Sequence, residues 1–300
     1  MVSDHTCPRW SNGILPRILN ALSVRYLKAN VLHVTGDIHY VNILTPKRHN
    51  ILTIHDVNFL SHAKGLKRAL LKLFWITIPI NRSAMVTTVS SETANRLIEL
   101  APKVRSKLRV IPDPANPNFH FVSANFNAQN PRILCVGTAA NKNLERLIEA
   151  CSMLSVEPVL DIVGPLTDSQ IQLLDEHKIN YLNSAGISND EMVEHYQKCD
   201  MLAFVSTAEG FGLPILEAQI TGRPVVTSNI SSMPEVAGDG AFLVDPLSPK
   251  SIADGLLKVI QDEEFRSRLI DRGRSNAKRF DIEVIASMYL DLYKELGLLN

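Results

Sequence analysis

The composition favours neither sign of charge. Lysine plus arginine number 31, and so do aspartate plus glutamate, which gives a formal net charge of zero. A chain without a surplus of positive charge has no overall field to attract nucleic acid or an anionic surface. We therefore expect no nucleic-acid partner, and any charged ligand must be held by a local group of residues.

Cysteine is scarce. The four cysteines lack the paired spacing of metal sites, and three lie in apolar contexts typical of buried free thiols. They are Cys7, Cys135, Cys151 and Cys199. This pattern indicates a reducing compartment and no metal site.

Long apolar runs and internal repeats are also missing. No stretch is long enough to cross a bilayer, and the first ten residues, MVSDHTCPRW, lack the apolar core of a signal peptide. An apolar fraction of 45% and a charged fraction of 21% are typical of a soluble globular protein, and 300 residues allow two domains. We expect a cytoplasmic protein.

Short β-branched runs alternate with helical patterns in two series. This alternation predicts an α/β fold with parallel sheets, and the second series predicts a doubly wound domain whose ligands bind beyond the carboxyl ends of the strands. The first series begins at Val31, Ile51, Met85 and Lys107, and the second at Arg132, Pro158, Ile179, Met201, Pro224 and Ala241.

Residues 113–131 separate the two series and show no periodicity. We predict a first domain over residues 1–116, a linker over 117–131, a second domain over 132–278 and a closing helix over 279–300. Hydrophobic spacing also predicts a helix between Ile14 and Leu27, and helical structure throughout Ser251–Leu298.

The segment Ser206–Gly222, read as STAEGFGLPILEAQITG, carries the most specific pattern. It follows an apolar run and ends in a short helix, with Pro214 expected at the first helical position and Gly222 just past the end. The glycines before the helix let the backbone turn and present N–H groups to an anion. Glu209 precedes this turn and Glu217 follows it. The alternative is that Glu209 only caps the helix.

This segment resembles the C-terminal signature of retaining GT-B glycosyltransferases of the group 1 type (family 4), which include bacterial mannosyl- and glucosyltransferases. The resemblance implies two Rossmann-like domains facing a cleft, with a nucleotide sugar as donor. It places Glu209 near the reacting carbon of the sugar and Glu217 at the ribose. The diphosphate would meet the turn formed by Gly210, Phe211, Gly212 and Leu213.

The loop after the first strand of the second domain contains Gly137 and Lys142. A lysine there can meet the same diphosphate, because parallel strands end at one edge of the sheet. The resembling family usually has arginines where this chain has Thr138 and Asn141, so the loop has lost positive charge. The alternative is a solvated lysine at a helix start.

Four further residues are candidates: His55 and Ile187 from the resemblance, and Asp37 and His39 because they also lie at the end of a strand. His55, at the end of a strand of the first domain, corresponds to a histidine that contacts the donor sugar; alternatively it binds a neighbouring loop. Asp37 and His39 are candidates for the acceptor side, with a purely structural role as the alternative. Ile187 lies where the family holds the nucleotide base by backbone contacts, which leaves the base unidentified.

Two segments depart from a simple interpretation. Residues 229–235 align with a Gly-Gly-x-Pro-Glu turn of the family but have Ser231 and Ser232 in the glycine places, and Pro234 is expected to begin a helix.

The stretch between Lys64 and Trp75 mixes basic and apolar residues. It predicts either a peripheral contact with the inner face of a membrane, near a lipid-linked acceptor, or a helix packed on its own sheet.

The start of the chain also differs from the family pattern, which begins with a strand and a Gly-rich loop. Only thirty residues precede Val31, and none form that pattern. We therefore expect an incomplete, N-terminally shortened first domain.

The resemblance implies transfer of a hexose from a nucleoside diphosphate sugar to a hydroxyl of a saccharide or lipid-linked acceptor, with retention and without a metal or cofactor. Two alternatives remain. One is a non-catalytic nucleotide-sugar-binding relative, and the other is a sugar-nucleotide epimerase.

Overall fold

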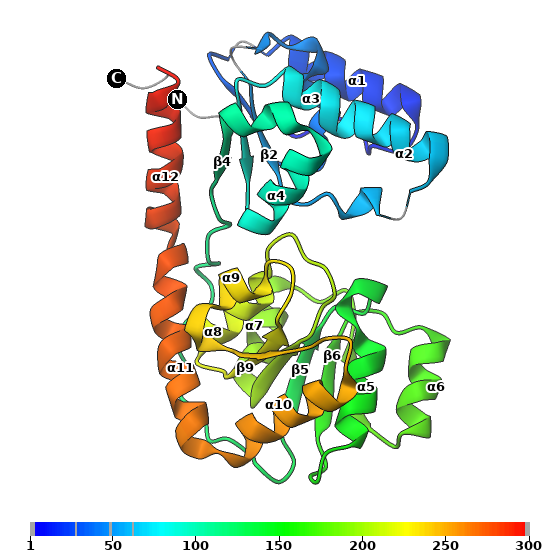
Figure 1. Cartoon of the computed structure of the whole chain (residues 1–300), viewed down its shortest axis with the longest axis vertical. Coiled ribbons are helices and arrows are strands. Elements are labelled where there is room, and N and C mark those ends of the chain that lie inside the picture. The colour runs from blue at the N-terminus through cyan, green and yellow to red at the C-terminus, as the bar shows by residue number, and fades with distance from the viewer. Residues whose placement is uncertain (1–3, 28, 48–49, 62, 298–300) are drawn as a thin grey trace. The chain divides into compact units, whose positions relative to one another are not determined.

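The computed structural model describes residues 4–27, 29–47, 50–61 and 63–297. These divide into two compact units, one made of residues up to Pro112 together with those from Ala286 onward, and the other of Asp113–Ile285. Each unit has its own parallel sheet (Figure 1). The predicted α/β fold class is confirmed.

Unit 1 contains four parallel strands that pair in chain order. They are β1 (Leu32–Val34), β2 (Asn50–Ile54), β3 (Met85–Thr88) and β4 (Leu108–Val110). The helical elements between and around them are α1 (Ile14–Arg25), η1 (His39–Leu44), η3 (Asn58–Leu60), α2 (Gly65–Leu71), the π-helix η4 (Lys72–Thr77), α3 (Ile78–Asn81), α4 (Ser91–Leu100) and η5 (Pro102–Lys107). All four predicted strands and the predicted first helix are present.

Unit 2 contains six parallel strands in the order β10-β9-β8-β5-β6-β7. This is the doubly wound order, in which the chain direction across the sheet reverses between β5 and β8. The strands are β5 (Arg132–Val136), β6 (Val159–Val163), β7 (Asn180–Ser184), β8 (Met201–Phe204), β9 (Val225–Ser228) and β10 (Phe242–Val244). The helices that follow them are α5 (Leu144–Ser152), α6 (Asp168–Glu176), α7 (Asn189–Lys198), α8 (Leu213–Thr221), α9 (Met233–Ala237) and α10 (Pro249–Gln261).

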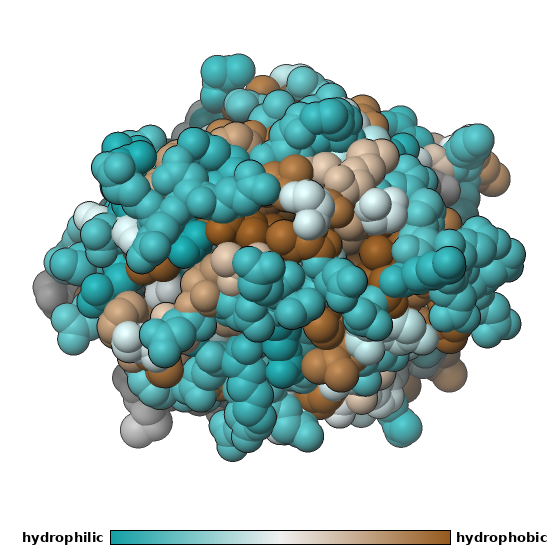
Figure 2. Space-filling view, turned by 90° about the horizontal axis from the view of Figure 1, so that it is seen from below, coloured by the Kyte–Doolittle hydropathy of each residue, from teal (hydrophilic) through white to brown (hydrophobic). Residues whose placement is uncertain are grey.

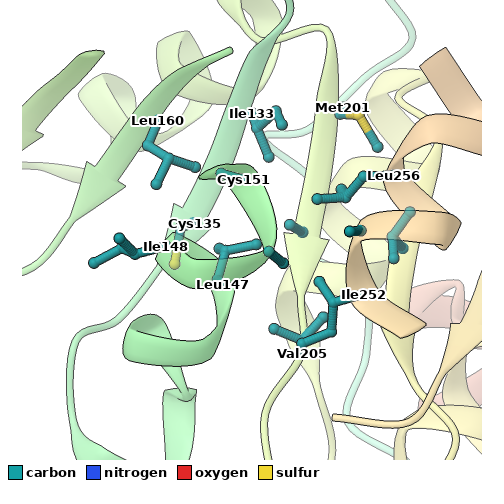
Figure 3. Close-up of a cluster of buried hydrophobic side chains, with 14 of the residues drawn as sticks. Ile133, Cys135, Leu147, Ile148, Cys151, Leu160, Met201, Val205, Ile252 and Leu256 are labelled. Carbon is teal, nitrogen blue, oxygen red and sulfur yellow. The ribbon is translucent and has the colours of Figure 1, made fainter. Parts of the chain in front are cut away.

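The main hydrophobic core of unit 2 lies between its sheet and the helices α5 and α10 (Figure 3). Leu147, Ile148 and Cys151 recur at helical spacing on α5 and are fully buried or nearly so, facing strand residues such as Ile133. Each buried leucine or isoleucine stabilises such a core by roughly 1.5–3 kcal/mol. All four cysteines are free, and burial raises the pKa of the Cys135 thiol to about 12.

The prediction of helix throughout the C-terminal segment needs correction. α10 ends before Asp262, whose carboxylate accepts a hydrogen bond of 2.9 Å from the amide of Phe265 and so caps the next helix, α11 (Glu263–Ala277). A short 3₁₀ turn then precedes α12 (Ile282–Glu295). Leu298, the predicted end, lies outside the described residues.

A fully buried carboxylate lies within the sheet of unit 2. Asp161 on β6 has no exposed surface, and its carboxylate accepts hydrogen bonds from Arg132 at 2.8–2.9 Å and from Nδ1 of His195 at 2.9–3.0 Å. A buried carboxylate requires such partners, since removing one leaves an uncompensated charge. This group ties β5 and β6 to α7.

The face of the molecule seen in Figure 2 is mostly hydrophilic, with hydrophobic residues visible in a recess near its middle.

Residues of α12 pack on the sheet of unit 1 through His33 of β1. Nδ1 of His33 lies 2.8 Å from the hydroxyl of Tyr293, Nε2 lies 2.8 Å from the hydroxyl of Thr53, and the ring of Tyr289 is 5.3 Å away. Burial, and to a smaller extent the charge of the nearby His55, lower the pKa of His33 to about 4. The imidazole is therefore neutral in the folded chain at pH 7.

We expect His33 to make the folded chain sensitive to mild acid. Between pH 6.5 and about 4 the unfolded chain takes up a proton at His33 that the folded chain does not, so stability falls as the pH falls through this window. The loss is about 3 kcal/mol at pH 4 relative to pH 7. Thermal unfolding measured from pH 7 to pH 4 should decline less in His33→Gln than in the wild type. His120→Gln, at an exposed position in unit 2, is the control. Parallel decline in His33→Gln and the wild type would contradict this assignment.

Candidate functional site

Two loops meet at the place where the strand order of unit 2 reverses. One follows β5 and the other follows β8, and these strands pair directly with each other. Such a reversal opens a crevice beyond the carboxyl ends of the strands. The loops are joined by their backbones, because the amide of Thr207 donates to the carbonyl of Asn141 at 2.8 Å. The side chain of Asn143 adds a bond of 2.9 Å to the carbonyl of Val205.

Lys142 and Glu209 form an ion pair across these loops. Nζ of Lys142 lies 2.8 Å from Oε1 of Glu209, and their side chains are 22% and 14% exposed. Asn141 donates to the same oxygen at 3.3 Å, and Nζ of Lys142 lies 4.8 Å above the ring centre of Phe204. Lys142 is therefore not a solvated lysine, and Glu209 does not cap α8, which begins without a side-chain cap.

Gly137 provides the space that the lysine needs. Its φ is +91°, and a Cβ there would lie 2.9 Å from Cγ and Cε of Lys142. Any larger residue would both strain the backbone and displace the lysine stem. The hydroxyl of the neighbouring Thr138 donates a hydrogen bond to the carbonyl of Pro165 at 2.6 Å.

The turn before α8 presents its backbone rather than its side chains. Phe211 is 6% exposed, and its ring packs edge-on against Phe280 at 5.6 Å, so it belongs to the core. Gly212 has a φ of +123°, which favours glycine, and Leu213 starts the helix. The first amides of a helix have no carbonyl one turn behind them and favour an anion. Gly210 lies at the opening of this turn, directly after Glu209.

Glu217 lies one turn into α8 and is mostly enclosed. Burial raises the pKa of its carboxyl, which lies beside the fully buried hydroxyl of Tyr196 on α7. The interaction with this hydroxyl opposes that rise in the pKa of Glu217. The two acids of the motif therefore differ, since Glu209 is paired with a cation and Glu217 faces a low-polarity contact between α7 and α8.

Ile187 lies in the loop between β7 and α7. Gly186 before it has a φ of +68°, and Ser188 after it caps α7 in a reciprocal arrangement with Glu191. The loop thus follows a strand at the edge of the same parallel sheet, and the side chain of Ile187 is half-buried.

The predicted residues of unit 1 occupy different environments. His55 follows β2, and its Nε2 donates to the carbonyl of Thr35 at 2.7 Å, so the alternative of a contact with a neighbouring loop is present. His39 is only 1% exposed and its Nδ1 donates to the carbonyl of Trp75 at 2.9 Å, while burial lowers its pKa. Asp37 is exposed, and its carbonyl accepts from Nε1 of Trp75 at 3.2 Å.

The loop between β9 and α9 contacts Glu209, which the sequence reasoning did not anticipate. The hydroxyl of Ser231 bonds both the amide and the carbonyl of Glu209, and Ser232 donates to the carbonyl of Phe211 at 2.6 Å. One feature of the sequence could have indicated this contact, because Ser231 and Ser232 stand where the family has glycines. Pro234 is the second residue of α9 (Met233–Ala237), so the predicted helix is present and begins one residue earlier than expected.

The described residues show neither a metal site nor a membrane-spanning helix. They contain no group of three or more His, Cys, Asp or Glu side chains arranged to hold a metal ion. In that same part of the chain, none of the helices has both the length and the apolar character needed to cross a membrane.

Comparison with known proteins identifies the family. The family described as "Glycosyl transferases group 1" matches residues 117–276, which is more than half of the chain and includes every loop of the unit 2 site. The chain belongs to this family. The resemblance read from the motif is thereby confirmed.

Two curated relatives illustrate the relationship. The O-antigen chain mannosyltransferase B of Escherichia coli is 32% identical over 178 residues, which cover 54% of this chain and 45% of the relative. The N,N'-diacetylbacillosaminyl-diphospho-undecaprenol alpha-1,3-N-acetylgalactosaminyltransferase of Campylobacter jejuni is 25% identical over 173 residues, 55% of this chain and 45% of the relative. The chain thus spans less than half the length of these relatives.

A solved structure supports the fold over nearly the whole chain. Anabaena Alr3699/HepE in complex with UDP and glucose superposes with a TM-score of 0.81 at 15% identity, covering 94% of this chain and 82% of that one. At this identity the similarity establishes the GT-B fold alone.

Proposed function

We propose that this chain is a glycosyltransferase that uses a nucleoside diphosphate sugar. The observation that carries the proposal is the Lys142–Glu209 pair beside the start of α8, at the strand reversal of unit 2. A cation and helix-start amides suit a diphosphate, and a carboxylate next to them suits the attached sugar. The names of the relatives and the UDP and glucose bound to HepE support this choice of donor.

In the proposed mechanism the diphosphate is the leaving group. Lys142 and the amides of Gly212 and Leu213 stabilise the negative charge that develops on it, as positioned donors do at other anionic transition states. The incoming diphosphate draws Lys142 away from Glu209, whose carboxylate then favours positive charge at the reacting carbon. Glu217 is assigned to the ribose and the backbone at Ile187 to the base. His55 is assigned to the sugar, and no metal or cofactor takes part.

The finer features of the reaction are also proposals. We infer a hexose donor, retention of the anomeric configuration and a role in bacterial polysaccharide, lipopolysaccharide or glycolipid synthesis. The two relatives named above support the role in synthesis, because one is an O-antigen mannosyltransferase and the other has a diphospho-undecaprenol acceptor in its name.

We expect Glu209→Gln to lower turnover by about 10²-fold or more, the range for a positioned catalytic group. Glutamine keeps the size of glutamate and one acceptor oxygen but loses its charge. The measurement is release of nucleotide from UDP- and GDP-sugars in the presence of saccharide and lipid-linked acceptors. Glu157→Gln, at an exposed position before β6, should match the wild type. Unchanged turnover in Glu209→Gln would remove the carboxylate from the mechanism.

A second part of the proposal concerns a membrane surface. α2 has no buried residue, and Leu66 and Leu70 on it are 76% and 46% exposed. Leu73 and Phe74 on the following η4 are also more than 40% exposed, and Lys67 and Arg68 lie among these apolar residues. Leu71 at the end of α2 packs against the core of unit 1, but these four apolar side chains stay exposed, so α2 and η4 leave part of their apolar side uncovered. We propose that this segment contacts an anionic membrane surface at which a lipid-linked acceptor is presented.

We expect the double substitution Lys67→Glu and Arg68→Glu to weaken binding to vesicles that contain anionic phospholipid. Each basic residue near such a surface contributes about 1 kcal/mol, so two lost charges alone give at least tenfold weaker binding. Sedimentation with vesicles of phosphatidylglycerol and phosphatidylcholine measures the effect. Lys103→Glu with Arg105→Glu, at exposed positions of η5, is the matched control. Equal binding of both double variants and the wild type, or no binding at all, would contradict the membrane contact.

A further inference from the structure

Ser231 lies beside the catalytic candidate Glu209 but contacts only its backbone. The hydroxyl of Ser231 accepts a hydrogen bond from the amide of Glu209 at 3.1 Å and donates one to the carbonyl of the same residue at 3.0 Å. A single hydroxyl thus engages both main-chain polar groups of Glu209. The peptide backbone from which the carboxylate projects is fixed on both sides.

The backbone of Ser231 is strained. Its φ is +61°, in the left-handed region that costs an L-residue about 1–2 kcal/mol and costs glycine almost nothing. The other non-glycine residues with positive φ in the described ranges are Asn143 and Lys178. Glycine would relieve the strain at position 231 but has no hydroxyl. A strained residue whose side chain makes two bonds to one neighbour indicates a role for that side chain.

The next residue extends the same attachment. Ser232 is fully buried, and its hydroxyl donates to the carbonyl of Phe211 at 2.6 Å. Phe211 is itself anchored by its ring contact with Phe280. The turn between Glu209 and Phe211 is therefore held at both ends by consecutive serines, while Lys142 holds the carboxylate.

We propose that Ser231 is a positioning residue for sugar transfer. It fixes the backbone of Glu209 so that the carboxylate keeps its place when the diphosphate of the donor takes Lys142 from it. This proposal rests on the proposed function, because it assigns Ser231 to the same reaction. Ser231 acts through Glu209 and does not itself touch the substrate.

The central variant is Ser231→Gly, which removes the hydroxyl and the strain together. We expect a melting temperature equal to or above that of the wild type, a kcat lowered about tenfold by misplacement of the carboxylate, and a smaller change in the KM of the donor. Lys178→Gly is the matched control. It relieves the same kind of strain at an exposed residue after α6 and should leave kcat unchanged. A wild-type kcat in Ser231→Gly overturns the proposal.

A double-variant cycle tests whether Ser231 acts through the carboxylate. In a Glu209→Gln background, Ser231→Gly should lower turnover no further, because the charged group that it positions is already gone. An equal loss with and without the carboxylate would mean that Ser231 only supports the fold, and would overturn the proposal.

Amide hydrogen exchange separates this proposal from the proposed function. In the whole chain, exchange over residues 207–212 should be faster in Ser231→Gly than in the wild type and unchanged in Lys178→Gly, whatever the activity. A wild-type chain without turnover on any donor would refute the proposed function. In that case hydrogen exchange still tests whether Ser231 holds the backbone of Glu209. Faster exchange in Ser231→Gly supports this attachment, and unchanged exchange overturns it.

Discussion

The ion pair between Lys142 and Glu209 is the interaction on which the candidate site depends. It joins the loops after β5 and β8, which the strand order brings together only at the reversal point of the sheet. Several other features serve this pair: Gly137 leaves room for the lysine stem, Asn143 links the two loops, and Ser231 holds the backbone of Glu209. The site is therefore built largely from main-chain geometry, with a few side chains setting its charge.

The pair also limits the electrostatic cost of placing these charges in the site. Two opposite charges that are mostly removed from water compensate each other, whereas either one alone would carry a desolvation cost. A diphosphate brings more negative charge than one carboxylate and can compete for the lysine. The charge of Glu209 would then become available at the sugar, at the moment when the donor is in place.

Much of the fold could be predicted from the sequence, because short apolar runs and intervening helical patterns are local signals. All ten strands follow from such signals, and so do the positions of Lys142 and Glu209 at one sheet edge. The proline signal predicts a helix start at Pro214, and α8 begins one residue earlier, at Leu213. The helix break at Asp262 also had a local signal, since aspartate is a favoured helix cap, but the continuous amphipathic pattern concealed it.

The remaining features depend on contacts between distant parts of the chain. Asp161 lies inside an otherwise apolar strand, and nothing local indicates that Arg132 and His195 compensate it. The same holds for the burial of His39, for the environment of His33, and for the two bonds from Ser231 to Glu209. Polar side chains in these places acquire their roles only from the tertiary structure, because each is satisfied by a partner that spacing does not reveal.

The most direct test of this account is calorimetric titration of UDP and of GDP against the wild-type chain, Lys142→Met and Glu209→Gln. If the pair is the docking point of the diphosphate, one nucleotide binds saturably, Lys142→Met weakens its affinity at least tenfold, and Glu209→Gln leaves it equal or tighter, because the competing carboxylate charge is gone. Absence of binding by both nucleotides, or equal weakening in the two variants, would contradict the account.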